Sequence, residues 1–396
     1  MFSQPIQKID NCLACGSDNL MPVLDLNTQP LANSYKKGKY AAEESYPLAI
    51  NVCKNCHHVQ LTHMVDPDLM YKDYLYVSGT TKTYLDYMDW FGPFCREKHG
   101  DPKSVLDIGC NDGSQLNVFK SMGLDTYGVD PAVNLYPLSS ENHNVCCGYF
   151  DDNYKQKVDL IISQNSFAHN QNPLEFLLNS KNNLNPNGLI FIQTSQSNMI
   201  THNEFDTIYH EHISFYNIKS MKMLCNRAGL NLIDVVKTPI HGISYVFIIS
   251  ADREAPYTID NLIAMETVSG LYNDVTYQEY SETCLKSVEK SKNYIDSMKK
   301  NGAIIVGYGA PAKGNTFLNF SKIRMDFIVD DNKLKQGMFT PGSSIPIVSS
   351  DDIKNLNPDV FVVFVPLAWN FFKEIKQRIK AIRNNPNDVF LNLNDI

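Results

Sequence analysis

The feature that most constrains the fold is a glycine turn between an apolar strand and a helical stretch. Residues 104–108 read as a buried strand that runs into Gly109-Cys110-Asn111-Asp112-Gly113-Ser114, and a helical pattern follows to Met122. Glycine lets the backbone approach a ligand closely, and a following helix presents free amides and the positive end of its dipole. The sequence therefore predicts an α/β domain that binds a nucleotide-like ligand at this turn.

A carboxylate follows the next expected strand, because residues 125–129 end in Asp130, where a ribose diol can be held. Asp107 precedes the turn and the G-x-G-x-x-G spacing is absent, which favours S-adenosylmethionine over a dinucleotide. Strands recur at 158–163 and 189–194 with helical patterns between them, as in a parallel sheet. The predicted cofactor residues are Asp107, Gly109, Asn111, Asp112 and Asp130.

Two Cys-x-x-Cys pairs precede this domain, and they predict a structural zinc site. Four thiolates satisfy one tetrahedral zinc ion, and a site closed in this way folds the module without leaving an open position for chemistry. His57 and His58 compete as ligands, and a redox or surface-thiol role is the alternative. The predicted ligands are Cys12, Cys15, Cys53 and Cys56.

A second α/β pattern begins after a long charged helix at 277–300. The strand 303–306 leads into a glycine loop from Gly307 to Thr316, and the strand 325–329 ends in Asp330-Asp331. A strand at 360–365, a helix at 368–382 and a strand at 389–391 complete a small doubly wound domain. The loop either holds a diphosphate with Lys313 alongside or is a tight turn beside a vestigial cofactor site, and both readings stay open.

Composition narrows the class of protein. A chain of 396 residues is expected to form two or three domains. The net charge of -8, with both signs interspersed, argues against nucleic-acid binding. The longest apolar runs, such as 360–366, are shorter than the roughly 20 residues of a membrane span, and the N-terminus has no hydrophobic signal core. We expect a cytoplasmic protein that does not bind membranes and has reduced cysteines.

Four ionisable side chains occupy consecutive positions from Tyr209 to His212. Tyr, Glu and His are the groups that remove a proton beside a carbonyl and stabilise the resulting charge. A core histidine is often only a hydrogen-bonded structural residue, but four such residues in a row favour proton chemistry.

These motifs together resemble the sugar C-methyltransferase family, which acts on nucleotide-linked 4-ketodeoxysugars. The resemblance rests on the two cysteine pairs, Asp-Ile-Gly-x-Asn-Asp-Gly, Asn165-Ser166-Phe167-Ala168-His169, Tyr-His-Glu-His-x-Ser-x-Tyr and the Gly-Tyr-Gly-Ala-x-x-Lys-Gly-Asn loop, and it covers nearly the whole chain. It implies a zinc module at 1–75, a class I methyltransferase domain of Rossmann-like fold at 76–251 and a smaller Rossmann-like domain at 252–396, with the sugar bound between the domains.

The resemblance also implies a site. His212 would remove the C3 proton, Tyr209 and Glu211 would orient substrate and base, and His169 would lie near the sugar, whereas His210 is read as structural. Asn165 joins the cofactor residues. The expected substrate contacts are Tyr76, Ser78, Lys313 and Asn315.

The expected reaction is removal of a C3 proton acidified by the C4 carbonyl, followed by methyl transfer from S-adenosylmethionine to that carbon. Alternatives are an O- or N-methyltransferase on a related sugar, an NAD-dependent oxidoreductase that uses the second glycine loop, and an inactive scaffold. The expected partner is a nucleotide diphosphate sugar, and the expected state is a monomer. The sugar, its nucleotide carrier and the C3 stereochemistry stay open.

Overall fold

A computed structural model describes residues 5–74, 76–80, 82–195, 198–240 and 244–393, and it divides the chain into two compact units. The first unit comprises residues 1–22, 50–198 and 211–276, and the second comprises 23–49, 199–210 and 277–396. The chain crosses between them within β2 (Leu20–Gln29) and β3 (Tyr46–Cys53). The units draw on segments from all three domains that the sequence suggests, and the boundaries at 75 and 251 stay predictions.

A seven-stranded sheet with the order β12-β13-β10-β9-β6-β7-β8 forms the centre of the first unit. Its central strands are parallel, whereas β13 is antiparallel to both β10 and β12. The strands are β6 (Ser104–Ile108), β7 (Asp125–Asp130), β8 (Asn144–Cys147), β9 (Val158–Gln164), β10 (Leu184–Ser195), β12 (Asn231–Thr238) and β13 (Ser244–Ser250). The strands predicted at 104–108, 125–129, 158–163 and 189–194 are confirmed.

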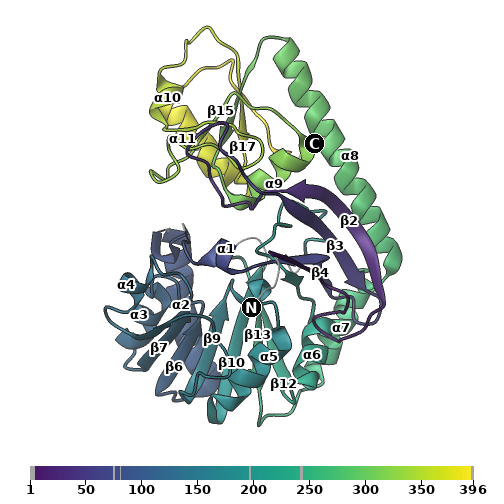
Figure 1. The fold of residues 1–396 in the computed structure, drawn as a ribbon, viewed down its shortest axis with the longest axis vertical. Helices are drawn as coiled ribbons and strands as arrows, with labels where there is room; N and C mark the ends of the chain where they lie inside the picture. Colours follow the sequence, from purple (N-terminus) through teal and green to yellow (C-terminus); the bar gives the residue numbers. More distant parts are fainter. Residues whose placement is uncertain (1–4, 75, 81, 196–197, 241–243, 394–396) are drawn as a thin grey trace. The chain divides into compact units, whose positions relative to one another are not determined.

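Helices cover both faces of this sheet (Figure 1). One face packs against α2 (Lys82–His99) and α3 (Ser114–Ser121), through apolar residues such as Phe91 and Phe119. The other face packs against α5 (Pro173–Asn182), α6 (Ile218–Arg227) and α7 (Thr258–Val268). The inner strands β6, β9 and β13 are buried on both faces, which explains their nearly continuous apolar runs. The short elements here are α4 (Tyr136–Ser139), η1 (Ser78–Thr80) and η2 (Phe167–His169).

Short strands build the cysteine-rich part of the first unit. The strand β1 (Ile6–Lys8) pairs with β5 (His63–Val65), and β4 (Val59–Leu61) pairs with both β3 and β11 (Ser214–Phe215). The helix α1 (Asp68–Tyr71) follows β5. The pairing of β4 with β11 joins two segments that lie about 150 residues apart in the sequence, a contact that no local pattern encodes.

The second unit contains a smaller, wholly parallel sheet with the order β16-β15-β14-β17-β18. Its elements are α8 (Asp274–Lys300), β14 (Ile304–Tyr308), α9 (Ala312–Ser321), β15 (Phe327–Val329), β16 (Ile347–Val348), α10 (Asp351–Lys354), β17 (Val362–Pro366), η3 (Trp369–Phe371), α11 (Phe372–Ile382) and β18 (Val389–Phe390). The strand order reverses beside β14, so the predicted doubly wound arrangement is confirmed.

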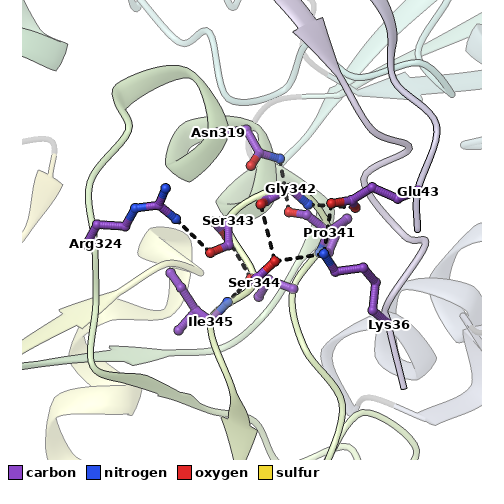
Figure 2. Close-up of polar contacts among 10 residues, drawn as sticks. Lys36, Glu43, Asn319, Arg324, Pro341, Gly342, Ser343, Ser344 and Ile345 are labelled. Carbon is purple, nitrogen blue, oxygen red and sulfur yellow. Dashed lines mark hydrogen bonds and ion pairs between the residues drawn. The ribbon is translucent and has the colours of Figure 1, made fainter. Parts of the chain in front are cut away.

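An ion pair between buried Lys36 and the more exposed Glu43 contacts the turn at 340–345 in this unit (Figure 2). The Lys36 ammonium donates to Glu43 Oε1 at 2.8 Å and to Ser344 Oγ at 2.7 Å. The amide of Gly342 donates to the second oxygen of Glu43, also at 2.8 Å. Both charges therefore have hydrogen-bonding partners, and the cluster holds the 36–43 segment against this turn.

Among the helices of the described ranges, none is long and apolar enough to cross a membrane.

Candidate functional site

The two cysteine pairs meet in the first unit. The Sγ atoms of Cys12 and Cys56 lie 3.6 Å apart, those of Cys15 and Cys53 lie 3.5 Å apart, and all four fall within 4.8 Å of one another. A tetrahedral zinc ion with Zn–S bonds of about 2.3 Å holds its sulfurs about 3.8 Å apart. The spacing fits zinc, and this is the only such ligand group within the described part of the chain.

The electrostatics of the cluster also fit a divalent cation. Hydrogen bonding to Cys53 raises the pKa of Cys12 to about 12, whereas the pKa of Cys53 is lowered by its bonds to Cys12 and Cys56. Without a cation, the cluster therefore carries only part of the negative charge that four thiolates would have. Zinc would ionise all four groups and hold the two loops together.

The histidines of the second loop have other contacts. His58 Nε2 lies 3.2 Å from Ser214 Oγ, and His57 Nε2 lies 3.8 Å from Asp274 Oδ1. Neither belongs to the group of sulfurs that can hold the metal. The structure thus brings together the four predicted ligands and leaves both competing histidines outside the set.

The predicted cofactor turn follows β6. Gly109 has a φ of +84°, and a side chain there would place its Cβ 2.6 Å from the Cβ of Ser166, so only glycine fits. The Gly109 amide donates to the Val129 carbonyl at 2.8 Å, which holds the turn against β7. The amides of Asn111 and Ala132 donate to the two oxygens of Asp130, each at 2.8 Å.

Acidic side chains concentrate at this turn. Asp107 is 3% exposed, and burial raises the pKa of its carboxyl to about 8, with further contributions from Asp130 and Asp112. Burial also raises the pKa of Asp130. Within the described residues, no group donates a hydrogen bond to Asp107. Such an environment favours a cationic ligand and opposes a diphosphate.

Three other predicted cofactor residues use their side chains within the protein. Asn111 Oδ1 accepts from the Ser78 amide at 2.9 Å, and Asn111 Nδ2 donates to the Tyr76 carbonyl at 3.1 Å. Asp112 Oδ2 accepts from the Gly79 amide at 3.0 Å. Asn165 Nδ2 lies 3.3 Å from the hydroxyl of Tyr84. Asn111 and Asp112 therefore place the 76–79 segment over the turn, where Tyr76 and Ser78 were expected to contact substrate.

Two buried glutamines escaped the sequence reasoning. Strand register places Asp107 opposite Ile162 and Gln164 opposite Gln193, so all three polar residues lie on the α2–α3 face of adjacent strands. Gln193 is fully buried, and neither atom of its amide has a hydrogen-bonding partner. Gln164 donates to Gln115 at 3.0 Å and leaves its own oxygen without a partner. The sequence signal that could have identified both glutamines is a polar residue at the carboxyl end of an apolar strand.

The predicted base lies in a cluster of aromatic and acidic side chains. The rings of His212 and His169 stack with centroids 5.3 Å apart, and the ring of Tyr71 stacks on His169 at 5.6 Å. Glu211 Oε2 accepts from the hydroxyl of Tyr74 at 3.0 Å. Burial lowers the pKa of His169 to about 4, so its imidazole is neutral near pH 7. Tyr71 and Tyr74, which the sequence did not single out, complete this cluster.

The 165–169 segment connects this cluster to the cofactor turn. Ser166 Oγ donates to the Ile108 carbonyl at 2.7 Å, on the side of Gly109. Three residues further, His169 stacks on His212, and the Ile213 amide donates to the Ala168 carbonyl at 2.9 Å. One short segment after β9 thus carries both the wall of the cofactor turn and the partner of the base.

Tyr209 and His210 belong to the second unit, in contrast to Glu211 and His212. Tyr209 is half-buried. His210 is almost completely buried, its Nε2 lies 3.3 Å from the Tyr46 carbonyl oxygen, and burial lowers its pKa to about 4. These contacts agree with the structural role expected of His210.

The second glycine loop closes like the first. The Gly309 amide donates to the Val329 carbonyl, and the amides of Ala310 and Asn332 donate to the two oxygens of Asp330. Lys313 Nζ is buried without a hydrogen bond, 5.1 Å from the centre of the Trp369 ring. Asn315, also expected to contact substrate, instead donates to the Ala32 carbonyl at 2.7 Å.

Comparison with known proteins gives three domain matches in chain order. Residues 12–71 match a model of a zinc binding domain, residues 83–235 match a methyltransferase domain, and residues 239–392 match a C-methyltransferase C-terminal domain. The strand order, the glycine turn and the second match together establish a class I methyltransferase domain of Rossmann-like fold. This domain binds S-adenosylmethionine, and the four cysteines form the metal site of the zinc-binding domain.

Individual proteins share different lengths of the chain. C-methyltransferase NovU of Streptomyces niveus is 29% identical over 399 residues, which cover 96% of this chain and 94% of that protein. A tRNA U34 carboxymethyltransferase of Campylobacter jejuni subsp. doylei is 29% identical over 156 residues, 34% of this chain and 52% of that protein. A solved S-adenosylmethionine-dependent methyltransferase from Clostridium acetobutylicum covers 43% of this chain and 91% of its own, with 13% identity and a TM-score of 0.36.

Proposed function

We propose that this chain, which belongs to the C-methyltransferases that join a zinc-binding domain to a methyltransferase domain, methylates C3 of a nucleotide-linked 4-ketodeoxysugar. The observation that carries the proposal is the 165–169 segment, which links the cofactor turn to the stacked pair His169 and His212. A base and a methyl donor that share one segment can act on the same carbon.

The base in this proposal is His212. The C4 carbonyl acidifies the C3 proton, and an imidazole nitrogen of His212 takes that proton, leaving the electron pair as an enolate. Glu211, held by Tyr74, orients the base, and neutral His169 stacks on it without adding a competing charge. Tyr209 is assigned to orienting the substrate. A positioned general base contributes about 10² to 10⁴ in rate.

The cofactor turn complements a cation. When bound, S-adenosylmethionine supplies an electrophilic methyl group and leaves as the neutral thioether. Asp107, Asp112 and Asp130 provide the negative potential for its ammonium and sulfonium groups, and Asp130 is assigned to the ribose. Asn111 and Asp112 keep the 76–79 segment over the turn, so their contribution to binding is partly indirect.

The nucleotide end of the substrate is assigned to Lys313, with Asn315 as a supporting residue. Lys313 belongs to the first turn of α9, and its ammonium is buried without a hydrogen bond, so a diphosphate oxygen would supply an acceptor there. The amide of Asn315 already holds the 32–35 segment, so we expect its effect to be structural support of the loop. The monomeric state and the cytoplasmic location stay predictions.

Two alternatives are less well supported. An O- or N-methyltransferase would use the same cofactor turn, but it needs no base able to take a proton from carbon. An NAD-dependent oxidoreductase would place a diphosphate at one of the glycine loops. The first loop is lined by buried carboxylates, which oppose a diphosphate, and in the second loop Ala312 stands in place of the third glycine of a G-x-G-x-x-G motif.

The test is incubation with methyl-labelled S-adenosylmethionine and a panel of nucleotide 4-ketosugars, followed by NMR of the product. We expect the label on C3, a carbon that then carries no hydrogen. A label on oxygen or nitrogen would support the O- or N-methyltransferase. Hydride exchange with NADH in place of methylation would overturn the assignment.

A further inference from the structure

The second metal-binding loop leads directly into β4, the strand that pairs with the segment carrying the base (the catalytic segment, residues 211–217). The loop ends at Cys56, and β4 begins three residues later at Val59. β4 pairs antiparallel with β11, Gln60 opposite Ser214 and Val59 opposite Phe215. Because β11 begins two residues after His212, only this strand pairing and a few residues on each side separate Cys56 from the base.

A buried side-chain contact runs beside this pairing. His58 is fully buried, and its Nε2 lies 3.2 Å from Ser214 Oγ. Its ring also packs on that of Tyr216, with the centroids 4.8 Å apart. His58 thus contacts the catalytic segment at two alternate positions, Ser214 in β11 and Tyr216 just after it.

The backbone around the base depends on the same partners. The Leu61 amide donates to the Ile213 carbonyl at 2.9 Å, and the Ile213 amide donates to the Ala168 carbonyl at 2.9 Å. The residue after His212 is therefore fixed between β4 and the segment that carries His169. A strand of two residues makes few ladder bonds of its own, so each of these contacts is a large share of what holds the base in place.

Both metal-binding loops also contact α6, which follows the catalytic segment. Asn217, the N-cap of α6, donates to the His57 carbonyl at 2.6 Å. Arg227, in the last turn of α6, donates to the Ala14 carbonyl at 2.8 Å in the first loop. The segment from 211 to 217 is thus held by the second loop on one side and begins a helix clamped by both loops.

We propose that His58 is a positioning residue for the base, and that its contact with Ser214, together with the β4–β11 pairing, couples the metal site to the geometry of His212. This inference rests on the proposed role of His212. The metal then has two roles, because it folds the cysteine-rich part and also sets where the base lies. A misplacement of about 1 Å at a reacting group can cost 10²-fold in rate.

The kinetic test uses Ser214→Ala, which removes the hydroxyl with little change of volume. We expect the turnover number to fall about 10- to 100-fold, with KM, cofactor affinity and one zinc per chain unchanged. Ser214→Thr retains a hydroxyl and should recover most of the turnover. Ser180→Ala is the matched control, because Ser180 is also fully buried and hydrogen-bonded, at 2.8 Å to the Phe176 carbonyl, but lies in α5. Wild-type turnover in Ser214→Ala, with turnover of His212→Asn reduced about 10²- to 10⁴-fold, would overturn the inference and leave the proposed function intact.

A second measurement does not depend on any substrate. Hydrogen–deuterium exchange of the intact protein should show that removal of zinc by a chelator speeds exchange in residues 211–217, with the Ile213 amide among the most affected. Residues 304–308, in the parallel sheet of the second unit, serve as the internal reference. If exchange in 211–217 is the same with and without metal, the coupling does not exist. If wild-type enzyme methylates no ketosugar, the proposed function fails, and this measurement still decides the coupling.

Discussion

Binding of S-adenosylmethionine should release a proton from Asp107. Burial and two nearby carboxylates raise the pKa of this group to about 8, so in the free protein at pH 7 it is about 90% protonated. A cationic ligand favours the ionised form and lowers that pKa on binding. Because pH 7 lies about one unit below this pKa, removing the proton costs roughly 1.4 kcal/mol. The affinity for the cofactor should therefore be about tenfold weaker at pH 7 than at pH 9.

Calorimetry in buffers of different ionisation enthalpy measures this release directly. The cofactor's own amino group also titrates, so the informative quantity is the difference between wild type and Asp107→Asn. We expect this difference to be about 0.9 proton at pH 7 and about 0.1 at pH 9. A difference near zero at both pH values, with equal affinities, would refute the assignment of Asp107 to the cofactor.

The same shift has a consequence for stability. A carboxyl whose pKa is raised on folding contributes stability below its unfolded pKa of about 4, and this contribution is lost as the pH rises through about 8. The contribution of Asp107 should therefore lower the melting temperature of the ligand-free protein at pH 9 relative to pH 6. Asp107→Asn should reduce that difference between the two melting temperatures. Thermal unfolding of both proteins at the two pH values checks the sign.

Three further predictions concern the base, the metal and the second unit. His212→Asn should retain cofactor affinity but lose about 10² to 10⁴ in turnover, because water must then take the proton. Glu211→Gln should lose less, because it leaves the base present but misplaced, and steady-state kinetics and calorimetry give the ranking. Elemental analysis should find about one zinc per chain, and Cys53→Ser should lower the yield of folded protein, whereas a folded, metal-free wild type would exclude a structural metal. Asp388→Ala should destabilise the second unit by about 3 kcal/mol in urea unfolding, because the buried guanidinium of Arg383 loses the carboxylate whose Oδ2 lies 3.0 Å from its Nε. A change below about 1 kcal/mol would mean that the three carbonyls to which Arg383 donates are enough to stabilise its charge.

Local patterns were sufficient for the parts of the molecule that depend on local chemistry. The turn at Gly109 needs glycine because of its backbone angle and its neighbour Ser166, and both requirements leave a recognisable motif. The cysteine pairs are similar, since each pair forms its own loop and the only long-range step is their meeting. The alternation of strands and helices likewise predicted the parallel strands of both sheets, but it did not predict the antiparallel strand β13.

The rest depended on pairings between distant segments. Gln193 lies beside Gln164 only because β10 pairs with β9 in one register, and a shift by one residue would turn its side chain to the other face. Tyr74 and Glu211 are 137 residues apart, and the two-residue strand β11 is too short to show any periodicity. Side chains brought together in this way carry no signal in the sequence until the pairing is known.

The central claim is that His212 removes a proton from carbon, and isotope exchange at C3 of the substrate tests it most directly. A nucleotide 4-ketosugar carrying deuterium at C3 is incubated in water with the enzyme and S-adenosylhomocysteine, which occupies the cofactor turn but has no methyl group to transfer. We predict that wild-type enzyme exchanges this deuterium for solvent hydrogen and that His212→Asn, with the same cofactor affinity, does so 10² to 10⁴ times more slowly. Equal exchange by the two proteins would contradict the account, because another group would then be the base.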